Sequence, residues 1–494
     1  MHGVYVTLVV IYEIIKVVAI VHVLMDNRHP VKTMAWAMVI YFVPVAGLVL
    51  YLFFGLNTRR EKLISQRSLD QLTRRSMLGF VDQTDMQVPE RYKQMVELFV
   101  NENSALPFKN NKVELFTNGY SFFLSLIADI GRARHHIHVD VYIFENDALG
   151  RLVRDVLIDK ARQGVEVRVI YDDVGSWSTD SEFFEQMRDA GVEVSPFLPV
   201  RFPQFAGKVN YRNHRKIFVI DGEVGYVGGY NIATRYVKGR DGMSWRDTMV
   251  RLTGNGVYGI QCTFLIDWYF VDRTMISSRD YYPPLSSAPV KGSISQVVNS
   301  CISQVVNSSP SSPYPSIMHG YVRALIEAKR YVYIQTPYFM PTESVLVAMK
   351  TAAIGGVDVR LMVPRKGDAH VVAWASRTYL REIMEAGVKV YMYSGGFLHS
   401  KILVADDSMA TCGSTNVDFR SFENNFESNV FFYDADTAVR FRKMFEVDIT
   451  SSVLLNSLPP ERLQVSFFAR LWDSITRLLA PVMRYFFKEV NEEL

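Results

Sequence analysis

The chain has 494 residues, with 54 lysines and arginines against 51 aspartates and glutamates, and a formal net charge of +3 at pH 7. This length is sufficient for two or three domains, while so small a net charge gives no indication of a nucleic-acid-binding protein. The three cysteines, Cys262, Cys301 and Cys412, show no CxxC spacing. Such a sparse set is typical of a reducing compartment and argues against a disulfide framework or a zinc site.

Two apolar runs in the first sixty residues predict a membrane anchor. They cover residues 4–25 and 34–56 and are separated by a short polar connection at 26–32. At about 1.5 Å per residue, each run spans roughly the 30 Å hydrocarbon core as a helix. We therefore expect residues 1–58 to form a transmembrane helical hairpin, with two buried soluble helices as the less favoured alternative.

Charged residues in and around this anchor predict its orientation. Glu13 and Lys16 interrupt the first run, and at a spacing of three they can pair on one helix face. An even number of crossings leaves the N-terminus and the rest of the chain on one side. The positive-inside rule places that side in the cytoplasm, because four basic residues follow the second run and two lie in the connection: Arg59, Arg60, Lys62 and Arg67 against Arg28 and Lys32.

The remainder of the chain contains two related halves. Residues 164–170 (GVEVRVI) parallel residues 356–362 (GVDVRLM), and residues 191–194 parallel residues 387–390. Continuous β-branched runs alternate with helical stretches in both halves, which indicates an α/β fold with a mixed, largely parallel sheet in each. We expect the two sheets to face one cleft.

These features divide the chain into five parts. The expected limits are 1–58 for the anchor, 59–107 for a linker with helical content, 108–285 for the first α/β domain, 286–455 for the second, and 456–494 for a C-terminal amphipathic helix.

Each half contains one copy of an HxKxxxxD motif. The first copy is His214, Lys216 and Asp221, and the second is His399, Lys401 and Asp406. An asparagine follows each histidine at the same distance of 17 positions, as Asn231 and Asn416. One short motif carries a high risk of a chance match, whereas two extended copies 185 residues apart are strong evidence for a shared function.

The residue types of the motif suit phosphodiester chemistry. One histidine can attack phosphorus as a neutral imidazole, while the other, as an imidazolium, protonates the leaving oxygen. Two lysines can neutralise the non-bridging oxygens, and the asparagines can add amide donors. Because His214 and Lys216 stand two apart on an expected strand, as do His399 and Lys401, each pair points to one face.

The two motifs resemble those of the phospholipase D superfamily, and within it the bacterial cardiolipin synthases. The resemblance covers most of the chain and implies two tandem phospholipase D-like domains that act through a phosphohistidine, without a metal or another cofactor. It implies that His214 is the nucleophile and His399 the general acid. It also implies that Asp247 and Glu427 orient the opposite or the local histidine. The first motif departs from the family pattern in having Gly229 where serine is more usual.

The function implied by the resemblance is cardiolipin synthesis at a bacterial cell membrane. Two phosphatidylglycerol molecules would give cardiolipin and glycerol on the surface of an anionic membrane. A phospholipase D-type hydrolase that releases phosphatidic acid is the alternative within the enzyme class, and a non-catalytic lipid-binding scaffold is the alternative outside it. A nucleic-acid partner is not expected, because no basic stripe with stacking aromatic residues appears.

Three further segments carry weaker predictions. Lys366 follows an expected strand of the second half and is a candidate contact for a lipid headgroup. The helix within 456–494 has an apolar face and a basic stripe, so it lies either on an anionic membrane or on the protein itself. The sequence ISQVVNS occurs twice, at 294–300 and 302–308, and only one copy is expected to pair in the sheet. The oligomeric state does not follow from the sequence.

Overall fold

Two units make up the chain: Met1–Glu61 with Val200–Tyr211, and Lys62–Pro199 with Arg212–Leu494. The computed structural model describes all residues except 1, 26–29, 52–89, 201–210, 241, 277, 285–300, 368–369, 460–465, 469–470 and 475–494. Several predictions therefore fall outside the described residues. They concern residues 59–89, the first ISQVVNS copy, most of the C-terminal helix and the flanking charges Arg28, Arg59, Arg60, Lys62 and Arg67.

The first unit contains one long apolar helix, α1 (His2–Met25). Its segment Gly3–Met25 has a mean hydropathy of 2.4 and is almost unburied. Among the described residues, this helix alone is long and apolar enough to cross a membrane. Glu13 and Lys16 form the expected pair on it, with 2.6 Å between the ammonium and carboxylate groups.

The second apolar run is divided into two helices. They are α2 (Pro30–Phe42) and α3 (Ala46–Leu50), with a turn between them. Pro44 lies in this turn; it has no N–H to donate to the preceding helical turn, and it disfavours a helical conformation at Val43. The continuous helix expected over 34–56 is therefore not confirmed.

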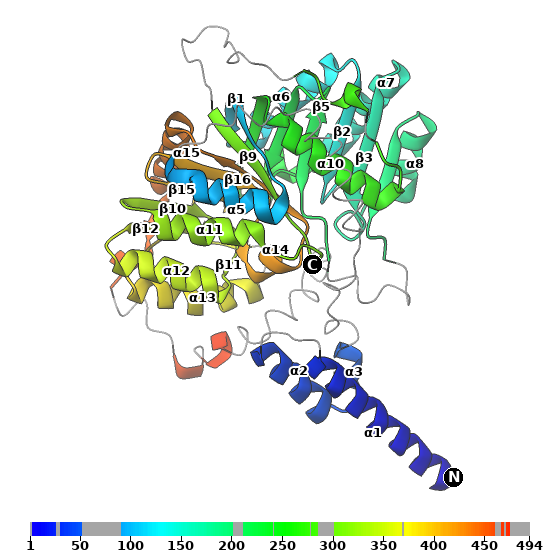
Figure 1. Cartoon of the computed structure of the whole chain (residues 1–494), viewed down its shortest axis with the longest axis vertical. Helices are drawn as coiled ribbons and strands as arrows, with labels where there is room; N and C mark the ends of the chain where they lie inside the picture. The colour runs from blue at the N-terminus through cyan, green and yellow to red at the C-terminus, as the bar shows by residue number, and fades with distance from the viewer. Residues whose placement is uncertain are drawn as a thin grey trace. The chain divides into compact units, whose positions relative to one another are not determined.

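The second unit contains one sheet of fifteen strands in the order β19-β13-β12-β10-β15-β16-β18-β9-β1-β8-β6-β5-β2-β3-β4 (Figure 1). Its described residues also form two short parallel pairs, β7–β14 and β11–β17. Its first half comprises β1 (Pro107–Phe116), α6 (Gly119–Arg132), β2 (His136–Val141), α7 (Ala148–Arg162), β3 (Glu166–Asp172), α8 (Ser181–Asp189), β4 (Glu193–Phe197), β5 (Lys216–Ile220), β6 (Val224–Gly228), α9 (Arg235–Lys238), β7 (Trp245–Arg246), β8 (Met249–Gly254) and α10 (Val257–Asp272).

The second half repeats this succession. It comprises β9 (Cys301–Ser308), α11 (Ser316–Glu327), β10 (Tyr331–Gln335), β11 (Phe339–Met340), α12 (Glu343–Ile354), β12 (Asp358–Pro364), α13 (His370–Glu385), β13 (Lys389–Tyr393), β14 (Phe397–Leu398), β15 (Ile402–Ala405), β16 (Met409–Gly413), β17 (Val417–Asp418), α14 (Phe419–Glu423), β18 (Glu427–Phe432), α15 (Ala435–Ile449) and β19 (Ser452–Leu454). Helix α5 (Lys93–Asn103) precedes both halves, and its Met95, Val96 and Phe99 are buried in the core of the second half.

Pairing in this sheet corrects the expected strand directions. Parallel pairs are confined to β2–β3–β4 and β10–β12–β13, and the other neighbours in the sheet are antiparallel. The prediction of largely parallel sheets is therefore wrong. The physical reason is that the motif strands lie in the hairpins β5–β6 and β15–β16, whose three-residue connections allow only antiparallel neighbours. The antiparallel pair β1–β9 also joins the two expected sheets into one.

Helices cover both faces of the sheet. Helices α6, α7 and α8 share one core with the first half, and α5, α11 and α12 share another with the second half. On the opposite face, α10 and α15 contact a third core to which strands of both halves contribute. Successive residues of β5, such as Phe218 and Val219, face opposite cores, as expected for a strand buried on both sides.

The second ISQVVNS copy lies within β9, near the middle of the sheet, between β1 and β18. The first copy lies outside the described residues, so the expectation that only one copy pairs stays a prediction.

Candidate active site

The two motif histidines lie just before β5 and β15, and each is bound through its backbone to the other half of the chain. The N–H of His214 donates to the carbonyl of Phe426 over 2.9 Å, and that of His399 donates to the carbonyl of Arg246 over 2.7 Å. The short parallel pair β7–β14 reinforces the second of these connections. Each half therefore positions the histidine of the other.

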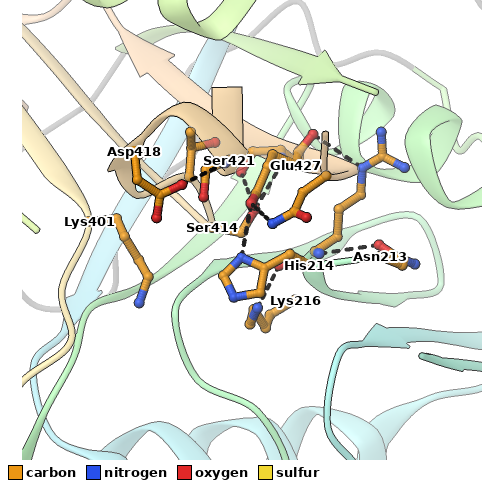
Figure 2. Close-up of polar contacts among 12 residues, drawn as sticks. Asn213, His214, Lys216, Lys401, Ser414, Asp418, Ser421 and Glu427 are labelled. Carbon is orange, nitrogen blue, oxygen red and sulfur yellow. Dashed lines mark hydrogen bonds and ion pairs between the residues drawn. The ribbon is translucent and has the colours of Figure 1, made fainter. Parts of the chain in front are cut away.

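The side chain of His214 is held by Glu427, the first residue of β18. Its Nδ1 lies 3.0 and 3.1 Å from the two carboxylate oxygens (Figure 2). Two further groups bind the same carboxylate: the Ser414 hydroxyl at 2.5 Å and the Asn425 amide at 3.1 Å. This buried set fixes the histidine ring through its inner nitrogen and leaves Nε2 as its reactive atom.

The side chain of His399 is held in the reciprocal way by Asp247 of the first half. Its Nδ1 lies 2.6 Å from the Asp247 carboxylate and 2.7 Å from Nζ of Lys401. An ammonium only donates, so Nδ1 cannot accept from Lys401 while it donates to Asp247. We assign the proton to Nδ1, facing the carboxylate, because Lys401 also donates to the His399 carbonyl. The lone pair of His399 then lies on Nε2.

The two motif lysines are buried beside the histidines. Nζ of Lys216 donates to the carbonyl of His214 over 2.5 Å and lies 5.3 Å from the centre of the Tyr142 ring. Its positive charge also acts on His399 of the other half. Figure 2 shows Lys401, from the second half, in the same close-up as Lys216 and His214. The structure thus brings both HxK pairs to one site.

The two buried carboxylates have different protonation states because their neighbours differ. It raises the pKa of Glu427 to about 8, although the charge of Lys216 opposes this. It would also raise the pKa of Asp247, but the positive charge of Lys401 and the bond with His399 prevail and lower that pKa. Burial, helped by the charge of Lys401, lowers the pKa of His399 to about 4. At neutral pH the site therefore contains a protonated Glu427, an ionised Asp247 and a neutral His399.

Gly229 and Ser414 occupy equivalent positions in the two halves but are not interchangeable. A Cβ added at Gly229 would lie 1.9 Å from a carboxylate oxygen of Asp247, so a side chain there would displace the carboxylate that holds His399. Ser414 instead uses its hydroxyl to bind Glu427. The departure from the family pattern at Gly229 therefore leaves room for the Asp247 carboxylate.

The motif aspartates lie elsewhere. Asp221 and Asp406 follow β5 and β15, at the ends of these strands remote from the histidines. Each carboxylate accepts three backbone N–H groups at 2.8–3.0 Å, from Arg134, His135 and His136 for Asp221 and from Lys329, Arg330 and Tyr331 for Asp406. The expected catalytic role of these two residues is not supported, because their carboxylates fix the start of β2 and of β10.

Three other predicted residues differ in their surroundings. The side chain of Asn231 accepts from the N–H of Ile143 and donates to the Tyr236 hydroxyl, so its amide is committed to the fold. Asn416 is buried, and its amide oxygen has no hydrogen-bond partner among the described residues. Lys366 is exposed in the bend that follows β12.

Sequence reasoning missed three contacts of the site. Ser414 and Asn425 bind Glu427, and the Tyr142 ring packs edge-on to His214 with 5.3 Å between ring centres. The sequence did contain a signal for two of them, since Ser414 stands eight positions after Asp406, in the extended second motif, and Asn425 stands two residues before Glu427.

This arrangement can carry out transfer at a phosphodiester. Two imidazoles, each held by a carboxylate at Nδ1, provide a nucleophile and a proton carrier. Two lysines provide positive charge for the phosphoryl oxygens in a water-poor setting, where it has most effect. The fold and the site together define a two-motif, phospholipase D-like phosphotransferase.

Comparisons with known proteins agree with this class. Residues 126–249 and 321–449 match the family model described as "Cardiolipin synthase, PLD-like domain", and residues 14–55 match "Phospholipase_D-nuclease N-terminal". The chain is 37 % identical to the cardiolipin synthase of Oceanobacillus iheyensis and 36 % identical to the major cardiolipin synthase ClsA of Bacillus subtilis; each match covers 94 % of this chain and 96 % of the relative. The chain therefore belongs to the cardiolipin synthase family of phospholipase D-like enzymes.

A solved structure supports the fold. The phosphatidylserine synthase of Haemophilus influenzae Rd KW20 superposes with a TM-score of 0.60 over 80 % of this chain and 99 % of its own, at 16 % identity. The family, the α/β class with tandem phospholipase D-like domains, and the enzyme class predicted from the sequence are thus confirmed.

Proposed function

We propose that the protein joins two phosphatidylglycerol molecules into cardiolipin and releases glycerol. The observation that carries this proposal is the reciprocal pairing of His214 with Glu427 and of His399 with Asp247 at one site. Membership of the cardiolipin synthase family supports the choice of lipid substrates.

The proposed reaction proceeds in two transfers. Nε2 of His214 attacks the phosphorus of the first lipid, the bond from phosphorus to the glycerol oxygen breaks, and His399 gives its proton to that oxygen. A glycerol hydroxyl of the second lipid then loses its proton to His399 and attacks phosphorus, and the bond to His214 breaks. Lys216 and Lys401 neutralise the phosphoryl oxygens in both steps. The phosphodiester anion supplies the charge that lets His399, neutral in the empty site, take up a proton.

Our functional division of the chain keeps the limits given by the sequence. Residues 1–58 anchor the protein, residues 59–107 link the anchor to the domains, residues 108–285 and 286–455 form the two halves of the enzyme, and residues 456–494 contact the membrane surface or the protein. The halves act on the cytoplasmic side of a bacterial membrane, because basic residues concentrate directly after the apolar segments. Lys366, exposed at the carboxyl end of β12, is proposed to contact a lipid headgroup.

Product analysis tests the proposed function. Purified protein is incubated in phosphatidylglycerol vesicles with a metal chelator, and the lipids are identified by mass spectrometry. We expect cardiolipin and glycerol, and at least 10²-fold less product from His214→Ala and from His399→Ala. His319→Ala, which removes a partly buried ion pair with Glu102, is the control and should keep its activity. Phosphatidic acid without cardiolipin would replace the transferase with a hydrolase, and no turnover of any phospholipid would favour the lipid-binding scaffold.

Trapping the intermediate assigns the two histidine roles. The reaction is stopped by rapid acid-free denaturation, and the peptides are mapped by mass spectrometry. A phosphatidyl group on the peptide that contains His214 is expected, whereas the same group on the peptide that contains His399 would exchange the roles.

A further inference from the structure

The second apolar run turns back on itself within the N-terminal unit. Val45, just after Pro44, donates its N–H to the hydroxyl of Tyr12 over 3.1 Å, and the Tyr51 hydroxyl lies 2.8 Å from Nδ1 of His22. Tyr12 and His22 are both on α1, and ten residues of helix correspond to about 15 Å. Residues 45 to 51 therefore run back along α1 toward its Met25 end.

Local packing builds this reversal into the fold. A Cβ at Gly47 would lie 2.3 Å from the carbonyl oxygen of Val39. A residue other than glycine at position 47 would therefore not let α3 approach α2 as closely. Val45 adopts a φ of 59°, which is costly for a β-branched residue and persists only where its surroundings impose it. Tyr51 packs on Trp36 and is buried with Val23 and Ile40.

The turn also leaves no backbone donor unpaired. The N–H groups of Val43, Ala46 and Gly47 donate to carbonyls within the segment, and Pro44 has no N–H. The remaining donor, the Val45 N–H, is taken by the Tyr12 hydroxyl. A non-helical turn is tolerated in the hydrocarbon region only if its polar groups are satisfied in this way.

We infer that α1 is the membrane crossing and that residues 30–51 form a re-entrant hairpin, which enters and leaves the bilayer on the face where α1 ends at Met25. The thirteen residues of α2 span about 20 Å as a helix, less than the roughly 30 Å of hydrocarbon core. The N-terminus then lies on the opposite face from the remainder of the chain, in place of the expected multi-pass hairpin with both on one side.

The distribution of charge supports the same arrangement. With two crossings, Arg28 and Lys32 would lie across the membrane from the four basic residues that follow residue 56, which weakens the bias described by the positive-inside rule to four against two. With a re-entrant hairpin, all six basic residues lie on one face, and the first twelve residues contain no lysine or arginine. The positive-inside rule then applies without exception.

Cysteine labelling in the full-length protein tests this topology. The native cysteines Cys262, Cys301 and Cys412 are buried, and the unaltered chain serves as the background control. Gly3→Cys, Lys32→Cys and Glu185→Cys are treated with a membrane-impermeant maleimide in intact cells and in inside-out vesicles. We expect Lys32→Cys and Glu185→Cys to react from one face and Gly3→Cys from the other. Reaction of Gly3→Cys and Glu185→Cys from the same face would overturn the inference.

A matched pair of variants tests the role of Tyr12. Tyr12→Phe leaves the Val45 N–H without a partner in hydrocarbon, so we expect roughly two- to ten-fold less membrane-inserted protein. Tyr5→Phe alters an exposed tyrosine of the same helix and should insert normally. Equal insertion of the two variants would contradict the hydrogen-bond argument.

A different observation concerns a polar cavity of about 470 Å³ in the first half of the enzyme. Its lining residues are Glu145, Asn146, Asp147, Ser178, Arg235 and Arg240. The lining residues 145–147 come shortly after Tyr142 in the chain, and the Tyr142 ring contacts His214. The lining residues Arg235 and Arg240 come shortly before Trp245, whose ring centre lies 5.3 Å from that of His399. Chain segments from this cavity therefore lead to both histidines.

The charges of the cavity favour a neutral polyol over a free anion. Two carboxylates and two guanidinium groups balance: Arg235 is paired with Glu145, and the Asp147 carboxylate accepts the N–H groups of Gly150 and Thr234. Acceptors and donors next to each other suit the hydroxyl groups of glycerol. We propose that this cavity binds the glycerol headgroup of the acceptor phospholipid, an assignment that rests on the proposed function.

Filling the cavity tests the second proposal. Ser178→Phe is compared with Glu185→Phe, which lies outside the cavity, in phosphatidylglycerol vesicles that contain methanol as a competing acceptor. We expect Ser178→Phe to form about ten-fold less cardiolipin while phosphatidylmethanol stays within about two-fold of the unaltered protein. Unchanged cardiolipin, or an equal loss of both products, would overturn the proposal. Failure of the unaltered protein to form cardiolipin would instead overturn the proposed function.

Discussion

At the scale of single residues, the two carboxylates that hold the histidines differ in charge. Glu427 has a pKa of about 8 and is protonated at neutral pH, whereas the pKa of Asp247 is lowered and the carboxylate is ionised. The pair of His214 and Glu427 thus holds a proton that the pair of His399 and Asp247 lacks. The proposed roles need one transferable proton at the site, and it must reach Nε2 of His399 before that residue can protonate the leaving oxygen.

These protonation states predict the pH dependence of the reaction. We expect kcat/KM to fall above about pH 8, because Glu427 then loses its proton and the site no longer holds the proton that His399 must deliver. Glu427→Gln cannot ionise, so its profile should lack the alkaline fall and lie roughly 10²–10⁴-fold lower. Glu185→Gln, on the surface of α8, should reproduce the original profile. An alkaline fall that persists in Glu427→Gln would assign that pKa to another group.

Gly229 and Ser414 give a second prediction at this scale. Gly229→Ala should lower kcat by about 10²-fold, because its Cβ displaces the Asp247 carboxylate and with it His399. Ser414→Ala removes one hydrogen bond from Glu427, worth about 0.5–1.5 kcal/mol, so its loss should stay within about ten-fold. Rates in lipid vesicles and thermal unfolding of both variants are compared. A Gly229→Ala enzyme as active as the original would show that Asp247 does not need its observed position.

At the scale of elements, the motif aspartates join the hairpins to their neighbouring strands. The Asp406 carboxylate accepts three N–H groups at the start of β10 and pairs with Arg91. Burial acts to raise its pKa, but these donors prevail and lower it. A lowered pKa means that the carboxylate stabilises the fold above about pH 4 and that this stabilisation is lost as the pH falls.

Substitution of Asp406 should therefore affect stability and spare the chemistry. We expect Asp406→Asn to lower the free energy of unfolding by about 2–4 kcal/mol at neutral pH, with kcat of the folded protein within about two-fold. The difference in stability should shrink below pH 4, where the original carboxylate is itself protonated. Asp189→Asn, at the exposed end of α8, is the control for a surface charge. A large loss of kcat with normal stability would return Asp406 to the active site.

Spacing within one element was predictable from the sequence, whereas partners across elements were not. Because His214 and Lys216 are two positions apart, the sequence placed both on one side of the strand. The structure then brings both HxK pairs together. The motif also includes Asp221, but a five-residue strand separates it from the histidine, and chain position alone does not tell which end of a strand faces the substrate. No local pattern specifies that Glu427 binds His214, because that contact depends on how the halves pair. The break at Pro44 was visible as a proline, yet the apolar composition around it suggested a continuous helix.

At the scale of the whole molecule, the catalytic unit has an internal two-fold order. Outward from β1 the sheet continues through β8, β6, β5 and β2, and outward from β9 it continues through the corresponding β18, β16, β15 and β10 (Figure 1). Since β1 and β9 are antiparallel, equivalent elements of the halves point in opposite directions. This symmetry explains why the carboxylate of each half holds the histidine of the other.

Reciprocal pairing within one sheet predicts that every active site is built from a single chain. Each histidine takes both its backbone partner and its carboxylate from the other half of the same chain, so a chain that lacks either histidine has no complete site. A mixture of His214→Ala and His399→Ala chains in the same phosphatidylglycerol vesicles should therefore form no more cardiolipin than either variant alone. The unaltered chain, diluted with an equal amount of either variant, should keep its specific activity. Recovery of a substantial fraction of activity in the mixed variants would instead mean that two chains exchange halves and that the site is shared between them.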